Sequence, residues 1–134
     1  MQECIFCKIV RGDIPNYTVY EDNHVLAFLD INPCAKGHTV VIPKVHSETL
    51  FDLNEDIIGN VFIAVKKVLE KIDIKLSPDG FNFGWNHGEA GGQSVPHLHV
   101  HVIPRWNNDG GGSMHSIVNK PGEQSVQEIA KFFE

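Results

Sequence analysis

The stretch QSVPHLHVHVIPR, residues 93–105, places a histidine at every second position, at His97, His99 and His101. In a β-strand successive side chains point to opposite faces, so residues two apart share a face. The aliphatic residues between the histidines are then buried, and three imidazoles line the other face. A row of imidazoles contributes little to packing. The pattern therefore predicts a chemical site on one strand of a sheet.

Working outward from this strand, four more segments have strand patterns. The run YTVYEDNHVLAFLDI, residues 17–31, predicts a hairpin with its turn at Asp22–Asn23. HTVVIP, residues 38–43, predicts a third strand, and FNFGWNH, residues 81–87, predicts a fourth. With the histidine-bearing run they give five strands, and no regular strand–helix–strand alternation separates them. This order is typical of an α+β fold built on a five-stranded antiparallel sheet.

One long helix and two short ones complete the predicted fold. CIFCKIVRG, residues 4–12, has apolar residues at helical spacing, and the longest helix should run from an N-cap at Asn54 to about Ile72. A tail helix is predicted at SVQEIAKFF, where Ser125 and Glu128 fit a capping box. The buried stripe of the long helix is predicted to comprise Ile58, Val61, Phe62, Val65, Leu69 and Ile72.

Composition narrows the class of protein. The 134 residues suit a single domain, residues 1–134, and 42% hydrophobic with 21% charged residues is close to the globular average. A formal charge of −6 without basic runs argues against binding to nucleic acid or an anionic membrane. The start MQECIFCKIV does not have the pattern of a signal peptide, and no apolar run is long enough to span a bilayer. Three cysteines without a secretory pattern lead us to expect reduced thiols and a cytoplasmic protein.

The glycine-rich loop GEAGGQS, residues 88–94, leads directly into the histidine strand. Backbone N–H groups of such loops form anion-binding concavities, and Gln93 and Ser94 add neutral donors. The loop could equally be a plain hairpin connection, but its position before three imidazoles favours a phosphate site. The imidazoles could hold a metal, act as nucleophile with supporting partners, or be structural. Because the glutamine, serine and glycines of the loop are neutral donors that suit a phosphoryl oxygen, we favour the nucleophile.

The run HLHVHVI resembles the signature of the histidine triad (HIT) superfamily. FLDINPCAKGHTVVIPKVH, residues 28–46, resembles its nucleoside-binding segment, and residues 91–105 resemble its catalytic segment, so the resemblance covers about residues 3–105. It implies a homodimer in which two protomers pair into a ten-stranded sheet. It also implies cleavage of the α-phosphate bond of an AMP-containing purine nucleotide through a nucleotidyl-histidine, without a catalytic cofactor.

The resemblance assigns roles residue by residue. His99 matches the nucleophile, with His101, His97 and His38 around it; Asp30 matches the ribose ligand. Positions that contact phosphate match Asn86 and Ser94, with Gln93 beside them. Without the resemblance, Asp30 would be a turn residue, and the residues matching the nucleobase slot would be ordinary core. These slot residues are Phe6, Ile9, Phe28 and Ile31.

Cys4 and Cys7 form a Cys-x-x-Cys pair that suits zinc ligands, a redox pair or two buried thiols. Some microbial members of the superfamily complete a zinc site with histidines at positions matching His46 and His97. The four residues would make a closed Cys₂His₂ site, so we expect a structural zinc that takes no part in the chemistry. Nothing in the sequence gives the third cysteine, Cys34, a role.

Residues 105–134 are predicted to be a variable C-terminal extension with a glycine-rich loop and a terminal helix. The extension lacks the tryptophan-containing tail of the phosphoramidase branch. A diadenosine polyphosphate and an adenosine phosphoramidate therefore both stay open as substrates, as does a nucleotide-binding module with slow residual hydrolysis. Arg105 and the loop NNDGGGS could contact a polyphosphate or form a linker, and His115 could approach the distal phosphates.

Overall fold

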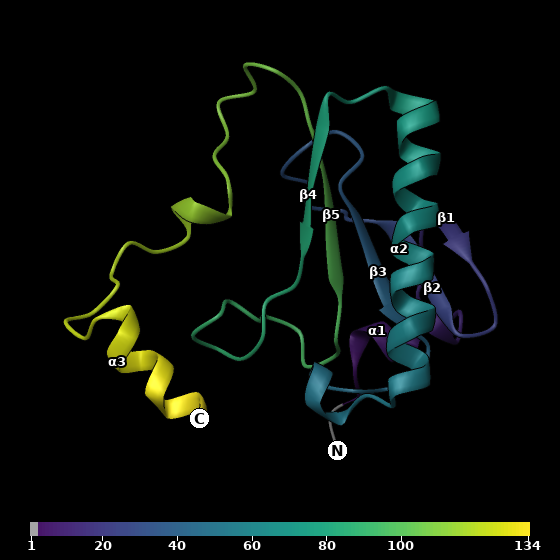
Figure 1. The fold of residues 1–134 in the computed structure, drawn as a ribbon. Coiled ribbons are helices and arrows are strands. Elements are labelled where there is room, and N and C mark those ends of the chain that lie inside the picture. Colours follow the sequence, from purple (N-terminus) through teal and green to yellow (C-terminus); the bar gives the residue numbers. More distant parts are fainter. Residues whose placement is uncertain (1–2) are drawn as a thin grey trace.

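The computed structural model describes residues 3–134 and has a five-stranded, fully antiparallel sheet in the order β1-β2-β3-β5-β4. The predicted α+β fold is confirmed (Figure 1). Neighbours in sequence pair as hairpins at β1–β2 and β2–β3, while β5 inserts between β3 and β4. The strands are β1 (Thr18–Glu21), β2 (Val25–Leu29), β3 (Thr39–Pro43), β4 (Gly80–Gly84) and β5 (Val100–Arg105).

Helix α1 spans Ile5–Val10, α2 spans Glu55–Leu76, and α3 spans Val126–Ala130. Asn54 caps α2 by accepting from the N–H of Asp56, as predicted, and the helix ends at Ser77 in the left-handed conformation. The capping box of α3, between Ser125 and Glu128, is also present. Short 3₁₀ turns lie at Leu50–Asp52, Met114–Ser116 and Lys131–Phe133.

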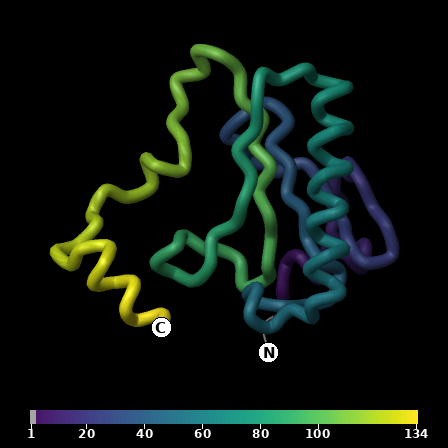
Figure 2. Tube along the Cα trace, viewed as in Figure 1, coloured from purple at the N-terminus to yellow at the C-terminus, as the bar shows by residue number. Residues whose placement is uncertain are grey.

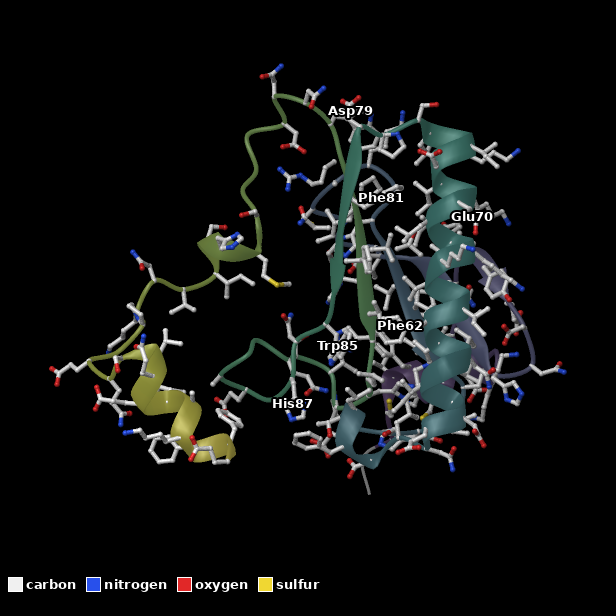
Figure 3. The ribbon with its side chains drawn as sticks, in the orientation of Figure 1. Phe62, Glu70, Asp79, Phe81, Trp85 and His87 are labelled. Carbon is white, nitrogen blue, oxygen red and sulfur yellow. The ribbon has the colours of Figure 1, made fainter. Side chains whose placement is uncertain are left out.

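The sheet separates two apolar layers. Helix α2 packs across one face, and its buried side chains meet the inward-facing residues of β2, β3 and β5 (Figure 1). Phe81 and Trp85 extend this layer at the β4 side, where the Trp85 and Phe62 rings lie 6.0 Å apart, edge to face (Figure 3). The buried residues of α2 are Val61, Ala64, Val65, Val68 and Ile72.

The opposite face carries the chemical residues. Here Ile9 of α1 packs on Leu26 and Phe28 of β2 and on Val40 and Ile42 of β3. The register pairs Val40 with His101 and Gly84 with His101, so the same face continues across β5 to β4. Helix α1 thus covers one side of this face, and the histidines lie beside it.

Three sequence predictions need correction. The ladder of β5 begins at Val100, because the N–H of Leu98 bonds to the carbonyl of Ser47 instead of to a neighbouring strand. Only His101 of the triad is therefore in the strand; His97 and His99 lie in the extended segment before it. The β4 ladder ends at Gly84, short of the predicted residue 87, and Phe62 is 43% exposed, so it is not part of the buried stripe.

Beyond Arg105 the chain leaves the sheet on the β4 side and runs along an extended course to α3 (Figure 2). From Asn107 onward every residue is exposed. Several of these are large apolar side chains, which is unusual for residues that cover nothing. The exposed apolar residues of this segment are Met114, Ile117, Val118, Val126, Ile129, Phe132 and Phe133. Within residues 3–134, no helix is long and apolar enough to cross a bilayer.

Candidate functional site

His99 lies at the point where the chain enters β5, and a backbone group fixes its proton. Its Nδ1 is 2.7 Å from the carbonyl oxygen of His97. A carbonyl only accepts, so Nδ1 carries the hydrogen and Nε2 keeps a lone pair. The ring is 5% exposed and is held edge to face by Phe6, at a centroid distance of 5.1 Å. An imidazole held this way presents Nε2 as the nitrogen that can act as a nucleophile.

His97 is fully buried, and its ring lies 5.8 Å from that of Phe6 in α1. Its Nε2–H donates to the carbonyl of Pro43 at 2.9 Å, which leaves the Nδ1 lone pair toward the two cysteines. Cys4 Sγ lies 3.4 Å and Cys7 Sγ 3.6 Å from that Nδ1. His46 Nδ1 lies 3.3 Å from Cys7 Sγ, and the four donor atoms are all within 4.8 Å of one another.

These distances fit zinc. Zinc–sulfur and zinc–nitrogen bonds at a tetrahedral angle separate S and N by about 3.6 Å. A backbone carbonyl that takes the outer N–H of a histidine ligand is a common way to orient that ligand. The sequence set Cys4, Cys7, His46 and His97 is therefore brought together in a geometry that a Cys₂His₂ zinc would need.

His38, which is buried, and His101, which is half-buried, form a pair of neighbouring imidazoles. His38 Nε2 and His101 Nδ1 are 2.9 Å apart, and the backbone N–H of Cys34 donates to His38 Nδ1 at 3.2 Å. Burial lowers the pKa of His38, and burial together with the neighbouring imidazoles of His99 and His38 lowers the pKa of His101 to about 4. Both rings are thus neutral at pH 7.

Asp30 follows β2 and lies next to this pair. One carboxylate oxygen accepts the N–H of Asn32 at 2.8 Å, and the other is 3.7 Å from His38 Nε2. The donor atoms of Asp30, His38 and His101 are close enough to hold a metal. However, the Cys34 N–H needs the lone pair of His38 Nδ1, so the proton lies on Nε2, the atom that would have to bind the ion. This tautomer opposes metal binding and suits hydrogen bonding.

Three of the four residues assigned to the nucleobase slot lie together. Phe6 of α1 meets Phe28 of β2 edge to face at 5.7 Å, and Ile9 belongs to the same apolar layer. Ile31 is 81% exposed, at the rim beside Asp30. Phe6 thus lies between this apolar layer and His99, and Asp30 lies beside His38.

The glycine-rich loop places Asn86 and Ser94 at the surface, while the side chain of Gln93 is engaged inside the loop. Gln93 Oε1 accepts the N–H of Gly88, and both of its amide hydrogens go to carbonyls, those of Glu48 and Val95. Gln93 therefore braces the loop and has no spare donor for a phosphate. Gly92 has a φ of +95°, a conformation that residues with a side chain rarely adopt. A Cβ at this position would lie 3.6 Å from the side chain of Asn86.

A cavity of about 350 Å³ lies on the other side of His101, between the sheet face and the start of the C-terminal extension. Its polar lining consists of Asn82, Asn86, His101, Ser113 and Ser116, and Ile103, Met114 and Ile117 are among its apolar residues. None of the described residues lining it is Lys or Arg.

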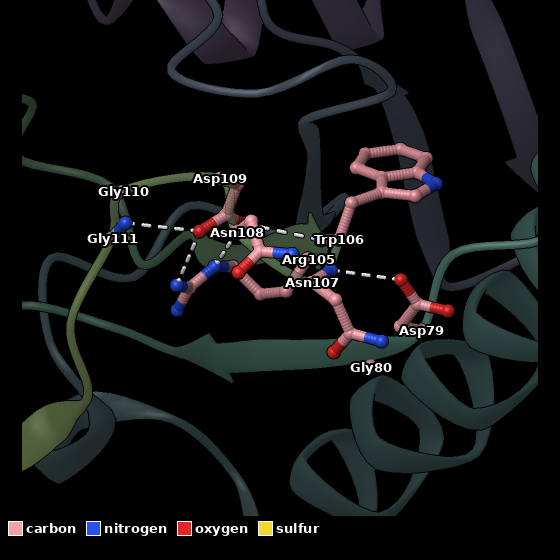
Figure 4. A pocket seen from close by; sticks show the side chains of 9 residues that line it. All are labelled: Asp79, Gly80, Arg105, Trp106, Asn107, Asn108, Asp109, Gly110 and Gly111. Carbon is pink, nitrogen blue, oxygen red and sulfur yellow. Dashed lines mark hydrogen bonds and ion pairs between the residues drawn. The ribbon is translucent and has the colours of Figure 1, made fainter.

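Arg105 lies outside that cavity and is bound by its own loop. Its guanidinium makes a paired contact with the Asp109 carboxylate at 2.7 and 2.8 Å (Figure 4). It also donates to Asn82 Oδ1 and Gly112 O. The same loop borders a separate cavity of about 530 Å³ with Asp79 (Figure 4). The arginine shapes residues 106–112 and leaves little donor capacity for a polyphosphate. His115 is exposed, with its Nδ1 3.5 Å from the hydroxyl of Ser113, and does not line the cavity beside His101.

Comparison with known proteins agrees with this geometry. The HIT domain family model matches residues 11–108. The chain is 49% identical to Protein hit of Bacillus subtilis over 133 residues (96% of this chain, 90% of that one). It is 43% identical to adenosine 5'-monophosphoramidase hnt1 of Schizosaccharomyces pombe over 108 residues (81% and 78%). A crystal structure of a HIT family protein from Bacillus anthracis superposes with a TM-score of 0.84 at 46% identity (98% and 95%).

Proposed function

Since this chain belongs to the HIT family, we propose that it is a nucleotide hydrolase that releases AMP from an adenylated substrate through a covalent intermediate on His99. The observation that carries the proposal is the fixed tautomer of His99, whose Nδ1–H is held by the carbonyl of His97. A relative named as an AMP phosphoramidase supports the class of reaction. Simple nucleotide binding would not require a buried imidazole with an oriented lone pair.

In the first step the Nε2 lone pair of His99 attacks the α-phosphorus, an Nε2–P bond forms, and the bond to the leaving group breaks. The ring then carries a positive charge, which its Nδ1–H shares with the His97 carbonyl. The N–H of His101 hydrogen-bonds to the phosphoryl group, and the leaving atom takes up a proton from solvent as its bond to phosphorus breaks. In the second step water attacks phosphorus and releases a proton to solvent, the Nε2–P bond breaks, and AMP leaves with neutral His99 restored. No metal is needed in either step.

The cavity beside His101 favours a small, uncharged leaving group. Its lining combines asparagine amides with apolar side chains of the extension, without a cation among the described residues. The nearest arginine, Arg105, is neutralised by Asp109. A polyphosphate would bring several negative charges into this cavity, whose lining residues offer no cationic partner. We therefore favour an adenosine phosphoramidate over a diadenosine polyphosphate.

We propose in addition that Cys4, Cys7, His46 and His97 hold a structural zinc. It would tie α1 to the segment that presents His99, since His97 belongs to both. The family match begins at residue 11, so it does not include the cysteine pair; the donor distances support the site.

A homodimer is also proposed, with β4, an edge strand of the sheet, as the pairing edge. The exposed apolar side chains beyond Asn107, on the same side as β4, support association (Figure 2). Light scattering on the full chain and on a truncation after Trp106 tests this. We expect a dimer that weakens on truncation; a full chain that is monomeric at micromolar concentration contradicts it.

The function is tested by measuring turnover of an adenosine phosphoramidate and of diadenosine tetraphosphate, with EDTA, for wild type and His99→Ala. We expect AMP release from the phosphoramidate without added metal, lowered at least about 10³-fold by the substitution, as for removal of a covalent nucleophile. Faster turnover of the dinucleotide would contradict the leaving-group assignment. Equal inactivity of both proteins with retained AMP binding would favour a binding module.

A further inference from the structure

The loop between β2 and β3 contributes a backbone group to the histidine pair. Cys34 N–H donates to His38 Nδ1 at 3.2 Å, and His38 is only 6% exposed. Unlike a side-chain hydroxyl, a backbone N–H can only donate. It therefore requires a lone pair on Nδ1 and leaves the hydrogen of His38 on Nε2.

The tautomer of His38 in turn determines the tautomer of His101. The Nε2–H of His38 points at His101 Nδ1, 2.9 Å away, and so requires a lone pair there as well. The hydrogen of His101 is then on Nε2, the nitrogen on the far side of the ring from His38. His101 thus offers a hydrogen-bond donor, and not a second lone pair, at the nitrogen turned away from His38, and its ring lies 5.0 Å from that of His99.

The loop itself is held in place, so the amide cannot easily turn away. His38 N–H donates to the carbonyl of Ala35 at 3.1 Å, and the carbonyl of His38 accepts the N–H of Asp30 at 2.9 Å. The Thr39 hydroxyl closes the turn on the carbonyl of Gly37, which has a φ of +83°. If His38 carried its hydrogen on Nδ1, that N–H would face the N–H of Cys34 and their hydrogen bond would be lost, while the bond to His101 would persist only with its direction reversed.

We propose that Cys34 is a positioning residue whose backbone amide, acting through His38, keeps His101 as a hydrogen-bond donor to the reacting phosphoryl group. The inference deepens the proposed function and rests on it. The thiol is dispensable: Cys34 Sγ lies 3.5 Å from His38 Nδ1 and only shares an acceptor that the amide already uses. Sequence gives no sign of this role, because any residue except proline supplies the same amide.

The test compares Cys34→Pro, which removes the amide hydrogen, with Cys34→Ala, which removes only the thiol. We expect Cys34→Ala to keep kcat within twofold of wild type. Cys34→Pro should lower kcat by about 10–100-fold, the usual cost of losing a partner that orients an active-site histidine, with a smaller change in KM. A folded Cys34→Pro protein with the kcat of Cys34→Ala overturns the proposal.

A double substitution separates the tautomer from general damage to the loop. In His38→Gln a side-chain amide supplies an N–H donor near the position of Nε2, and this donor does not depend on a tautomer. Adding Cys34→Pro to His38→Gln should then change kcat less than about twofold, although it costs tenfold or more in wild type. An undiminished loss in the His38→Gln background overturns the proposal.

Imidazole ¹⁵N NMR of the wild-type chain tests the same point without any substitution. We expect the hydrogen on Nε2 for both His38 and His101 at pH 7; a hydrogen on Nδ1 of either ring overturns the proposal. This reading does not depend on turnover. If the wild type released AMP from no substrate while both rings carried hydrogen on Nε2, the proposed function would fail and the tautomer assignment would stand.

Discussion

Replacing both cysteines of the Cys-x-x-Cys pair is expected to remove zinc and lower the melting temperature without removing the nucleophile. In wild type the donor atoms of Cys4, Cys7, His46 and His97 lie within 4.8 Å of one another. The variant Cys4→Ser/Cys7→Ser keeps the volume of the site and removes both thiolates. Cys34→Ser is the matched control, because Cys34 is a free thiol outside this set.

The size of the effect follows from linkage. Zinc at 100 times its dissociation constant stabilises the native state by about 2.7 kcal/mol, and tighter binding adds more. Unfolding entropy near 60 °C is about 2.1 cal/mol/K per residue, or about 0.28 kcal/mol/K for 134 residues. The ratio predicts that the melting temperature falls by at least about 10 °C.

Two measurements check this on protein purified without chelator. Elemental analysis should find one zinc per chain in wild type and in Cys34→Ser, and none in the double variant. Calorimetry should give the loss of melting temperature in the double variant alone. Below its melting point the double variant should keep turnover within about tenfold, because none of the four ligand side chains reaches the phosphorus. Wild type free of zinc, or melting curves that coincide, would refute the reasoning.

Three further outcomes are expected. Ile72→Ala, in the buried stripe of α2, should lower the free energy of unfolding by about 2–5 kcal/mol in urea, whereas Ile74→Ala, at 76% exposure, should change it by less than about 0.5 kcal/mol. Asp30→Asn should raise KM about 10-fold or more, with a smaller loss of kcat, because its carboxylate is proposed to bind the ribose hydroxyls. With a 2',3'-dideoxy substrate, wild type and Asp30→Asn should have the same KM. The Arg105 side chain holds the pKa of Asp109 below its usual range, so the ionised carboxylate stabilises the fold above the ordinary Asp pKa, and this is lost as pH falls through the lowered native pKa. Urea unfolding of Asp109→Asn should therefore differ from wild type at pH 7, and the two should converge at strongly acidic pH.

Sequence patterns predicted the elements whose stability is local. These elements depend on contacts between residues only a few positions apart, and all of them are present. They are the N-cap at Asn54, the capping box of Ser125 and Glu128, and the hairpin turn at Asp22. Alternation likewise predicted correctly that Leu98, Val100 and Val102 are buried.

The prediction of a continuous histidine strand was wrong because a ladder needs a partner. β3 pairs with β5 only at Val100–Val102, and Leu98 instead bonds to Ser47, a residue distant in sequence. The alternation of polar and apolar residues cannot predict this long-range hydrogen bond. Gln93 is a similar case: its polar side chain next to glycines suggests a phosphate donor, but Glu48 and Val95 provide carbonyls that use both of its amide hydrogens.

The sequence also does not predict the tautomers of the histidines. The side chains of the triad are plain in the sequence, yet what each imidazole can do depends on which nitrogen carries hydrogen. Here backbone groups decide this: Pro43 O for His97, His97 O for His99, and Cys34 N–H, through His38, for His101. Because His97 contributes its ring to the proposed zinc site and its carbonyl to the nucleophile, metal binding and catalysis share one residue without sharing an atom. The proposed metal would therefore influence the reaction only through the position of that carbonyl, a coupling expected to be small while the fold is intact.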